Sequence, residues 1–396
     1  MRFLNSIIKD LGEKALCRNG ITVLIMAVAG LAGIIESRAC TSAIIGAEMN
    51  PSGRPILWKH RDTSAIDNKV EFIPANGDEY GFVALYNASD KNLKEAWMGM
   101  NDHGFAIMNT ASYNIKDDKV SAKKMDKEGI VMSKALRTCR TVEDFARLLE
   151  EWPRPMGVEA NFGVIDATGN GAYFETNNHS YRRYDLKDAP DHVLVRTNYS
   201  HSGRPGEGYG HVREANANCE LAPHIAVGCI TPEVLTEELS RHFYHDGRKE
   251  DLTMSGRKDV LDEDYIPRYK STATIAIEGC RPVETPDSVT PGFVENEYIM
   301  WTGIGYPPVS EIRAVRCAED GVDPDLQGLQ RDGHSKLSDQ ARRDRDAVFT
   351  LKGKNKYVDI SRLFNAEGTG IAQLKIQKNA ETYRREKEKR DKKIDQ

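Results

Sequence analysis

The stretch Ser37-Arg38-Ala39-Cys40-Thr41-Ser42-Ala43-Ile44-Ile45-Gly46 joins two segments of different character. Before it, residues 21–35 read ITVLIMAVAGLAGII without a charge, and a basic lead-in with Arg2, Lys9, Lys14 and Arg18 precedes them. Small residues at positions 37 and 39 satisfy the small-x-small preference of signal peptidase, so we expect residues 1–39 to be a cleavable signal peptide. Cleavage would make Cys40 the first residue, with a thiol and a free α-amine on one amino acid, followed by a strand-like run.

Other interpretations of this stretch stay open. A membrane anchor needs roughly 20 apolar residues, so residues 21–35 are too short for one, and we expect no stable membrane span after processing. Cys40 could instead be the lipidated cysteine of a bacterial lipoprotein, although Arg38 fits that signal poorly. A signal peptide predicts a secreted or periplasmic protein.

The composition excludes several classes of function. The chain has 396 residues, enough for one large domain or two ordinary ones, and its formal net charge of -5 gives no electrostatic case for nucleic-acid binding. Its seven cysteines are widely spaced and do not form a disulfide framework, although one pair is possible. The sequence holds no CxxC or Cys/His cluster, no GxGxxG and no P-loop, so we expect neither a metal nor another cofactor.

Short apolar or alternating runs separated by turn residues predict strands in two blocks. The first block comprises residues 41–47, 55–59, 70–74, 81–86 and 104–112, with a hairpin turn at Asn50-Pro51-Ser52-Gly53. The second comprises residues 161–166, 171–175, 181–184 and 192–197, and late strands follow at 271–278 and 298–303. Helices are expected at 130–139, after a cap at Thr141, at 209–221 and at 232–243.

This order of elements predicts an α+β fold with helices stacked on sheets. Several strands, including residues 41–46, are apolar on both faces, which is typical of sheets covered from both sides. We expect one domain over residues 40–370. The charged segment 371–396 lacks a continuing apolar stripe, which predicts a frayed surface helix or disorder; a basic partner-binding tail is the alternative.

The ordered motifs resemble those of the linear amide C–N hydrolases. They are Cys40-Thr41-Ser42, Lys59-His60-Arg61-Asp62, Gly99-Met100-Asn101-Asp102-His103-Gly104, Arg196-Thr197-Asn198 and Trp301-Thr302-Gly303-Ile304-Gly305-Tyr306-Pro307-Pro308. That group includes choloylglycine (bile salt) hydrolases, penicillin V acylases and isopenicillin-N acyltransferase-like enzymes. The resemblance implies the four-layer αββα sandwich of antiparallel sheets of the N-terminal nucleophile (Ntn) hydrolases. Relatives are often multimeric, so it also implies a possible homo-oligomer.

The resemblance implies roles for six residues. Cys40 would be the nucleophile, with its α-amine as the base. Asp62 would orient the amine, and Lys59, which stands where bile salt hydrolases have Arg, would favour the thiolate as a single-point cation. Asn109 and Asn198 align with the oxyanion amides of the family, and Arg213 falls near a family site Arg. Lys59-x-x-Asp62 looks more like the acyltransferase-type branch, which weakens any expectation of bile salts.

Three hypotheses follow for an exported chain that acts on a small-molecule acyl amide. The first is hydrolysis of a linear non-peptide amide through a Cys40 thioester, and the second is transfer of the acyl group to an amine with the same residues. The third is a catalytically silent, lipoprotein-like binding module with an acylated Cys40. We expect specificity to lie in the loops 111–125 and 200–210, whose composition does not name a substrate.

Overall fold

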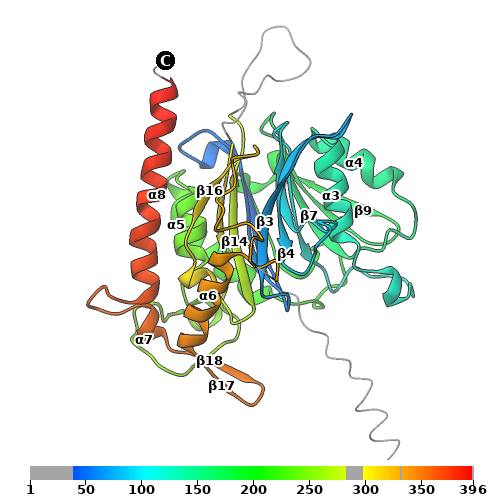
Figure 1. Ribbon diagram of the computed structural model, residues 1–396. Coiled ribbons are helices and arrows are strands. Elements are labelled where there is room, and N and C mark those ends of the chain that lie inside the picture. The colour runs from blue at the N-terminus through cyan, green and yellow to red at the C-terminus, as the bar shows by residue number, and fades with distance from the viewer. Residues whose placement is uncertain (1–38, 282–297, 331, 395–396) are drawn as a thin grey trace, which may run out of the picture. The chain divides into compact units, whose positions relative to one another are not determined.

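The computed structural model describes residues 39–281, 298–330 and 332–394. The predicted signal peptide and Cys17 therefore lie outside the described residues, apart from Ala39. Two large antiparallel sheets form the centre of residues 38–396 (Figure 1).

The first sheet has six strands, and it carries the residues that follow Cys40. In spatial order they are β10 (Val193–Arg196), β1 (Thr41–Ile45), β2 (Ile56–Asp62), β14 (Ser271–Glu278), β15 (Ile299–Ile304) and β16 (Arg313–Val315). The predicted hairpin is confirmed, because β1 pairs with β2 in the register Ser42 to Lys59. All five residues of β1 are buried, as expected of a strand that is apolar on both faces.

The second sheet is a seven-stranded meander in which each strand pairs with its neighbours in the sequence. Its strands are β3 (Asn68–Ile73), β4 (Phe82–Asn87), β5 (Met98–Asn101), β6 (Ala106–Ala111), β7 (Ala160–Ile165), β8 (Gly171–Thr176) and β9 (Tyr181–Asp185). Among them only β5 is absent from the predicted strands. This strand has only four residues, Met-Gly-Met-Asn, and a run of this length does not show an alternation of apolar and polar side chains.

The side-chain alternation of β1 and β2 divides the core into two layers. Ile44 and Leu57 face the second sheet, and they belong to a core that continues under α3 (Glu128–Thr138) and α4 (Val142–Glu151). Ala43 and Trp58 face the other way, toward α5 (His211–Ala226), the π-helical turn η5 (Val234–Leu239) and α8 (Ile371–Ile394). Helices thus cover the outer faces of both sheets, and the predicted α+β, four-layer αββα fold is confirmed.

The predicted cap at Thr141 is also confirmed. Its hydroxyl accepts the Asp144 N–H at 3.1 Å and starts α4, with Asp144 completing the reciprocal capping box.

Several elements after residue 240 lie outside the sequence prediction. They are α6 (Lys336–Val348), α7 (Ile360–Leu363), the short strands β11 (Tyr244–His245), β12 (Glu250–Asp251), β13 (Val260–Leu261), β17 (Phe349–Lys352) and β18 (Asn355–Val358), and the edge strand β16 of the first sheet. Single 3-10 turns are η1 (Ala47–Met49), η2 (Ala122–Lys124), η3 (Leu186–Asp188), η4 (Pro190–His192), η6 (Asp246–Arg248) and η7 (Pro307–Val309). Several of the elements after residue 240 pack around a third core that includes Phe243, Tyr306 and Leu363.

Of the two alternatives expected for 371–396, a frayed surface helix or disorder, the structure has a helix over the part that it describes, and this helix is packed rather than frayed. Residues 371–394 form α8, whose Tyr383 belongs to the core beside the first sheet. The helix lacks an apolar stripe because part of its buried side is polar. Asn379 donates to Glu237 Oε1 at 3.1 Å, and Glu386 accepts from Arg316. Polar residues that find buried partners are invisible to a hydrophobicity pattern.

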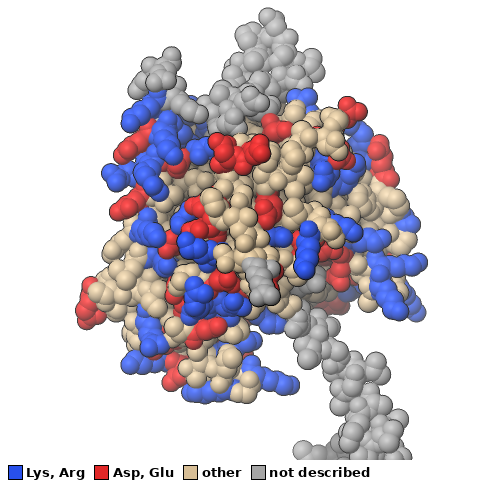
Figure 2. Space-filling view, in the orientation of Figure 1, with Lys and Arg blue, Asp and Glu red and all other residues tan. Residues whose placement is uncertain are grey.

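The described cysteines, Cys40, Cys139, Cys219, Cys229, Cys280 and Cys317, are all free, so the possible disulfide does not form among them. No helix in the described ranges has the length and apolar character needed to cross a membrane. On the face in Figure 2, acidic and basic side chains are interspersed.

Candidate active site

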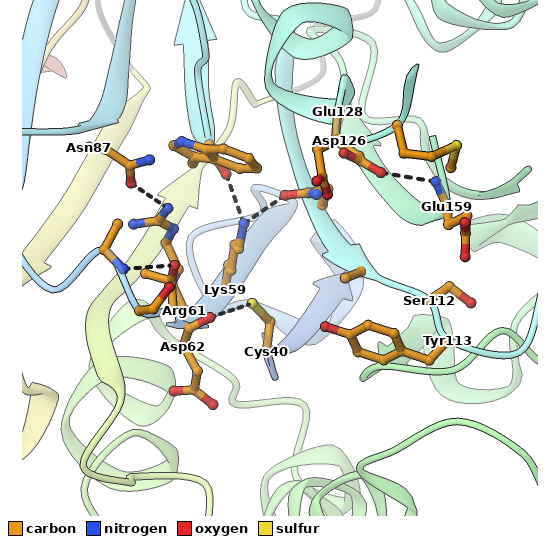
Figure 3. A pocket seen from close by; sticks show the side chains of 17 residues that line it. Cys40, Lys59, Arg61, Asp62, Asn87, Ser112, Tyr113, Asp126, Glu128 and Glu159 are labelled. Carbon is orange, nitrogen blue, oxygen red and sulfur yellow. Dashed lines mark hydrogen bonds between the residues drawn. The ribbon is translucent and has the colours of Figure 1, made fainter. Parts of the chain in front are cut away.

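A cavity of about 220 Å³ lies at the end of β1 and β2, where the first sheet meets β6 of the second. Four of the six predicted site residues line it: Cys40, Lys59, Asp62 and Asn109. Figure 3 shows Cys40 and Lys59 in the middle of the cavity, with Arg61 and Asn87 on one side and Glu128 and Glu159 on the other. The remaining wall consists of Thr63, Ser64, Ala65, Trp97, Ala111, Ser112, Tyr113, Met125 and Asp126.

Cys40 immediately precedes β1, and its side chain lies on the face of the strand that points between the sheets. It is 6% exposed, and its Sγ lies 3.8 Å from the backbone oxygen of Asp62. Its backbone nitrogen donates to Asn198 Oδ1 at 2.7 Å. Both the sulfur and the backbone nitrogen of Cys40 are therefore within hydrogen-bonding distance of a defined partner.

Arg213 and Asn198 lie behind Cys40 and fix its backbone. The Arg213 guanidinium donates to the Cys40 carbonyl oxygen at 2.6 Å and to Asn198 Oδ1 at 2.9 Å. Gly210 precedes α5 with φ +91°, and a Cβ there would come within 2.3 Å of the guanidinium. Glycine at this position thus allows both the turn into α5 and the approach of the arginine. Burial, with Arg268 next in importance, lowers the pKa of Arg213 to about 9.

The side-chain amide of Asn198 mainly holds the Cys40 backbone, Arg213 and the Ala111 carbonyl together. The oxygen accepts from both Cys40 and Arg213, and the Nδ2 amide donates to the Ala111 carbonyl at 2.9 Å. This arrangement favours a role in holding the Cys40 nitrogen over the predicted role as an oxyanion donor.

Lys59 and Asn109 form the opposite side of the cavity from two different sheets. Lys59 Nζ donates to the Trp97 carbonyl oxygen and to Asn109 Oδ1, both at 2.9 Å. Because its oxygen faces the ammonium, Asn109 must point its Nδ2 donor elsewhere, and this amide makes no hydrogen bond to another described residue. Burial lowers the pKa of Lys59 to about 7, although Cys40 and Asp62 oppose the change.

Asp62 contacts Cys40 through its backbone rather than its carboxylate. The carboxylate accepts from Ser271 Oγ at 2.6 Å and pairs with the Arg268 guanidinium. Arg268 also donates to the Ala39 carbonyl oxygen at 3.0 Å, so it joins Asp62 to the peptide bond that precedes Cys40. Burial alone would lower the pKa of Arg268, but Asp62 raises it above its usual range.

His60 lies beside this network without entering the cavity. It is fully buried, and its Nε2 lies 2.8 Å from Ser271 Oγ. Burial lowers its pKa to about 4, so the ring is neutral at physiological pH.

Sequence reasoning missed Arg268, Ser271, Trp97, Glu128 and Glu159. Arg268 and Ser271 flank the start of a predicted strand, and no spacing linked them to Asp62 more than 200 residues earlier. The expected specificity loops are only partly involved: residues of 111–125 line the cavity, whereas none of 200–210 does.

Two groups in the described part of the chain have the composition of metal ligands, Asp67/His334/Asp339 and Asp117/Asp118/His179. Neither lines the cavity. Arg342 already pairs with Asp67 and Asp339, which does not favour a cation there.

Residues 73–239 match the family of acyl-coenzyme A:6-aminopenicillanic acid acyl-transferases. No curated protein matches the chain. Among solved structures, the chain is similar to a variant of conjugated bile acid hydrolase from Clostridium perfringens. The two chains are 12% identical with a TM-score of 0.40, and the match covers 72% of this chain and 95% of the hydrolase. The chain is also similar to the Caenorhabditis elegans ortholog of N-acylethanolamine-hydrolyzing acid amidase, with 15% identity, a TM-score of 0.35, and coverage of 49% and 87%.

A third structure, penicillin V acylase from Agrobacterium tumefaciens, has 16% identity and a TM-score of 0.25, with coverage of 37% and 49%. The structural likenesses are distant. The predicted resemblance is confirmed by the family match, which names the acyltransferase branch of that group and runs from the last residue of β3 through η5.

Proposed function

We propose that this chain is an exported cysteine hydrolase of linear, non-peptide amides whose mature form begins at Cys40. The observation that carries the proposal is the placement of Cys40. Its sulfur lines the cavity between Lys59 and Asp62, and Asn198 holds its nitrogen. A residue with a thiol and a free α-amine in this position has its own base attached.

In the proposed reaction, the Cys40 thiol gives its proton to the α-amine, and the sulfur attacks the amide carbonyl carbon. The C–N bond then breaks as the α-ammonium returns that proton to the leaving nitrogen. The acyl group remains on sulfur as a thioester. Water, deprotonated by the same α-amine, attacks the thioester, and the acid leaves with the thiol restored.

Asn109 is the best-placed donor for the oxyanion formed in both steps. Lys59 holds its amide oxygen, which leaves Nδ2 available without placing a second charge on the substrate carbonyl. Lys59 also provides a cation near Cys40 that favours the thiolate.

Asp62 and Arg268 act on the nitrogen side of Cys40 in this proposal. Removal of Ala39 takes away a hydrogen-bond acceptor of Arg268 and leaves the new α-ammonium next to the Arg268–Asp62 pair. Asp62 can then orient the amine as the sequence resemblance implies.

Export fits the burial of the cleavage point. Ala39 is 2% exposed in the folded chain, and its carbonyl oxygen is hydrogen-bonded to Arg268. A peptidase acting in trans would therefore have to cut before this fold forms, as signal peptidase does during export.

The proposal is tested on protein secreted with its native leader. Mass spectrometry of the purified chain should give an unmodified N-terminal Cys40; a diacylglyceryl-Cys40 would support the lipoprotein-like binding module instead, and another start would refute the α-amine base. A screen of acyl amides should then find a substrate, and Cys40→Ala should lower its hydrolysis by roughly a thousandfold or more. Cys219→Ser, at an exposed cysteine outside the cavity, is the matched control.

Acyl transfer is the second candidate, and the acyltransferase family match favours it. The same thioester would be attacked by an amine instead of water. Adding amine acceptors to the hydrolysis assay separates the two: a transferase forms the new amide at the expense of the free acid.

A further inference from the structure

A second cavity, of about 590 Å³, lies at the end of the first sheet that is opposite to Cys40. Its wall includes residues of the turn between β1 and β2, from Asn50 to Arg54. From this turn β2 runs for seven residues, or roughly 20 Å, to Asp62 at the active-site cavity. Among the described residues none lines both cavities, so this one is separate from the proposed active site.

Two buried aromatic rings give part of the wall an apolar surface. Trp301 on β15 and Tyr383 on α8 are 4% and 5% exposed, and their ring centroids lie 4.5 Å apart. The Tyr383 hydroxyl is hydrogen-bonded to Thr236 Oγ1 at 2.5 Å. Pro51 and Pro232 extend the surface. Because the fold holds these side chains in place, an apolar ligand group can pack on them without ordering a flexible side chain.

The helix α8, which runs along the edge of the structure in Figure 1, turns basic side chains toward this surface. Tyr383, Lys387 and Arg390 are spaced at i, i+4 and i+7, which is one face of a helix. Since Tyr383 packs on Trp301, the same face carries Lys387 and Arg390 to the cavity, and all three residues line it.

Basic side chains outnumber acidic ones around the cavity. Glu233 and Glu278 are in the wall, and Glu386 pairs with one of its arginines from outside it. The basic residues of the wall, apart from Arg54, are Arg281, Arg316, Lys387, Lys389, Arg390 and Lys392. Burial alone would raise the pKa of Glu278, but the Arg390 guanidinium lowers it below its usual range. The potential in the cavity is therefore positive.

Two lysines of this wall have no carboxylate partner. Lys387 and Lys392 are exposed and make no ion pair with any residue that the structure describes. Glu233 is the one carboxylate of the wall that is likewise unpaired within the described ranges. An anion in the cavity would therefore meet ammonium groups that no carboxylate already binds.

Two arginines of the wall also have donors to spare. Arg390 pairs with Glu278 at 2.6 Å and Arg316 pairs with Glu386 at 2.5 Å, each through Nη2. Their other guanidinium N–H groups make no hydrogen bond to a described residue. Since a guanidinium has five N–H donors, each arginine can also donate to a second anion.

We propose that this cavity binds an organic anion whose carboxylate or phosphate is attached to an apolar body. The anionic head is held by Arg316, Arg390 and the two lysines, and the apolar body packs on Trp301 and Tyr383. A free fatty acid and an acidic phospholipid share this chemistry. The inference does not depend on the proposed hydrolase function.

Isothermal titration calorimetry on the purified chain tests the proposal with four probes. They are octanoate, acetate, octan-1-ol and octylamine, of which only octanoate combines an anion with an apolar body. We expect the Kd of octanoate to be about tenfold or more below that of each other probe, because charge-assisted hydrogen bonds and apolar burial act together. Equal binding of octanoate and octan-1-ol, or tighter binding of octylamine, would overturn the inference.

The double variant Lys387→Gln/Lys392→Gln locates the binding. It removes two exposed cations without breaking an ion pair of the described chain, and the Kd of octanoate should rise by about tenfold or more. Lys91→Gln/Arg384→Gln makes the same change in net charge at exposed positions outside the cavity and should leave the Kd unchanged. Thermal melting establishes that both variants fold.

An unchanged Kd in the first double variant, or an equal rise in the control, contradicts the assignment. Neither lysine lines the active-site cavity, so octanoate bound beside Cys40 would give that unchanged Kd.

Vesicle sedimentation separates the two sources of the anion. Binding to phosphatidylglycerol vesicles, but not to phosphatidylcholine vesicles, that is lost in Lys387→Gln/Lys392→Gln assigns the cavity to an acidic lipid. Octanoate binding without vesicle binding assigns it to a free acid. If neither octanoate nor phosphatidylglycerol binds, the inference is refuted, whatever the outcome of the amide hydrolysis screen.

Discussion

Replacing Lys59 with Met should remove a pH dependence from the stability of the protein and make it less active. Lys59 is buried between the sheets, and its hydrogen-bond partners, the Trp97 carbonyl and the Asn109 amide oxygen, are neutral. Burial lowers its pKa from 10.5 to about 7, which corresponds to a cost of about 5 kcal/mol for keeping the lysine charged in the folded chain. Methionine has a similar length and avoids this cost. It leaves two buried acceptors without a donor, however, and each of them lowers the free energy of unfolding by about 1–3 kcal/mol.

The pH dependence separates the two effects. Below about pH 7 the lysine is protonated in the folded and the unfolded chain, so the whole cost is present. Between about pH 7 and pH 10.5 only the unfolded chain keeps the proton, and the stability of the wild type rises with pH. The loss of hydrogen bonds in Lys59→Met has no such dependence.

Urea unfolding of both chains at several pH values provides the measurement. From about pH 7.5 to pH 9.5 the wild type should gain about 2–3 kcal/mol relative to Lys59→Met. Lys91→Met, at an exposed lysine, serves as the control and should give a difference that is independent of pH. A flat difference for Lys59→Met would refute the claim that this buried ammonium limits stability.

Further substitutions test the other parts of the site. Asn109→Ala should lower kcat by about 100–1000-fold with little change in KM, since it removes a donor used only for the oxyanion; an equal loss in Asn114→Ala, at an amide outside the cavity wall, would contradict this. Asp62→Asn leaves the Arg268 charge buried without its partner and should cost about 3–5 kcal/mol in the free energy of unfolding, measured by urea denaturation. Arg213→Lys keeps the positive charge but removes the planar guanidinium whose two nitrogens join the Cys40 carbonyl to Asn198, so kcat should fall more than KM rises. An unchanged kcat would exclude a positioning role for Arg213.

Most strands of the two sheets, but not β5 or β16, could be predicted because their alternation and turn residues are local. The run 41–46 is apolar on both faces, and this alone predicts a sheet that is covered on both sides, as β1 is. The same reasoning did not predict the packing of α8, whose buried residues include Asn379 and Glu386. Their partners, Glu237 and Arg316, are distant in the sequence, and a pattern of hydrophobicity does not report them.

For the site, the sequence predicted Cys40, Lys59, Asp62, Asn109, Asn198 and Arg213, through the resemblance of its motifs to those of a known family. Only the tertiary structure decided how their atoms are used: Asn198 supports the Cys40 nitrogen, and Asp62 turns its carboxylate to Arg268. It alone also brought Glu128 and Glu159 to the wall of the cavity. The physical reason is that strand formation depends on neighbours in the chain, whereas charge, hydrogen bonding and shape in a cavity depend on groups that folding brings together from far apart.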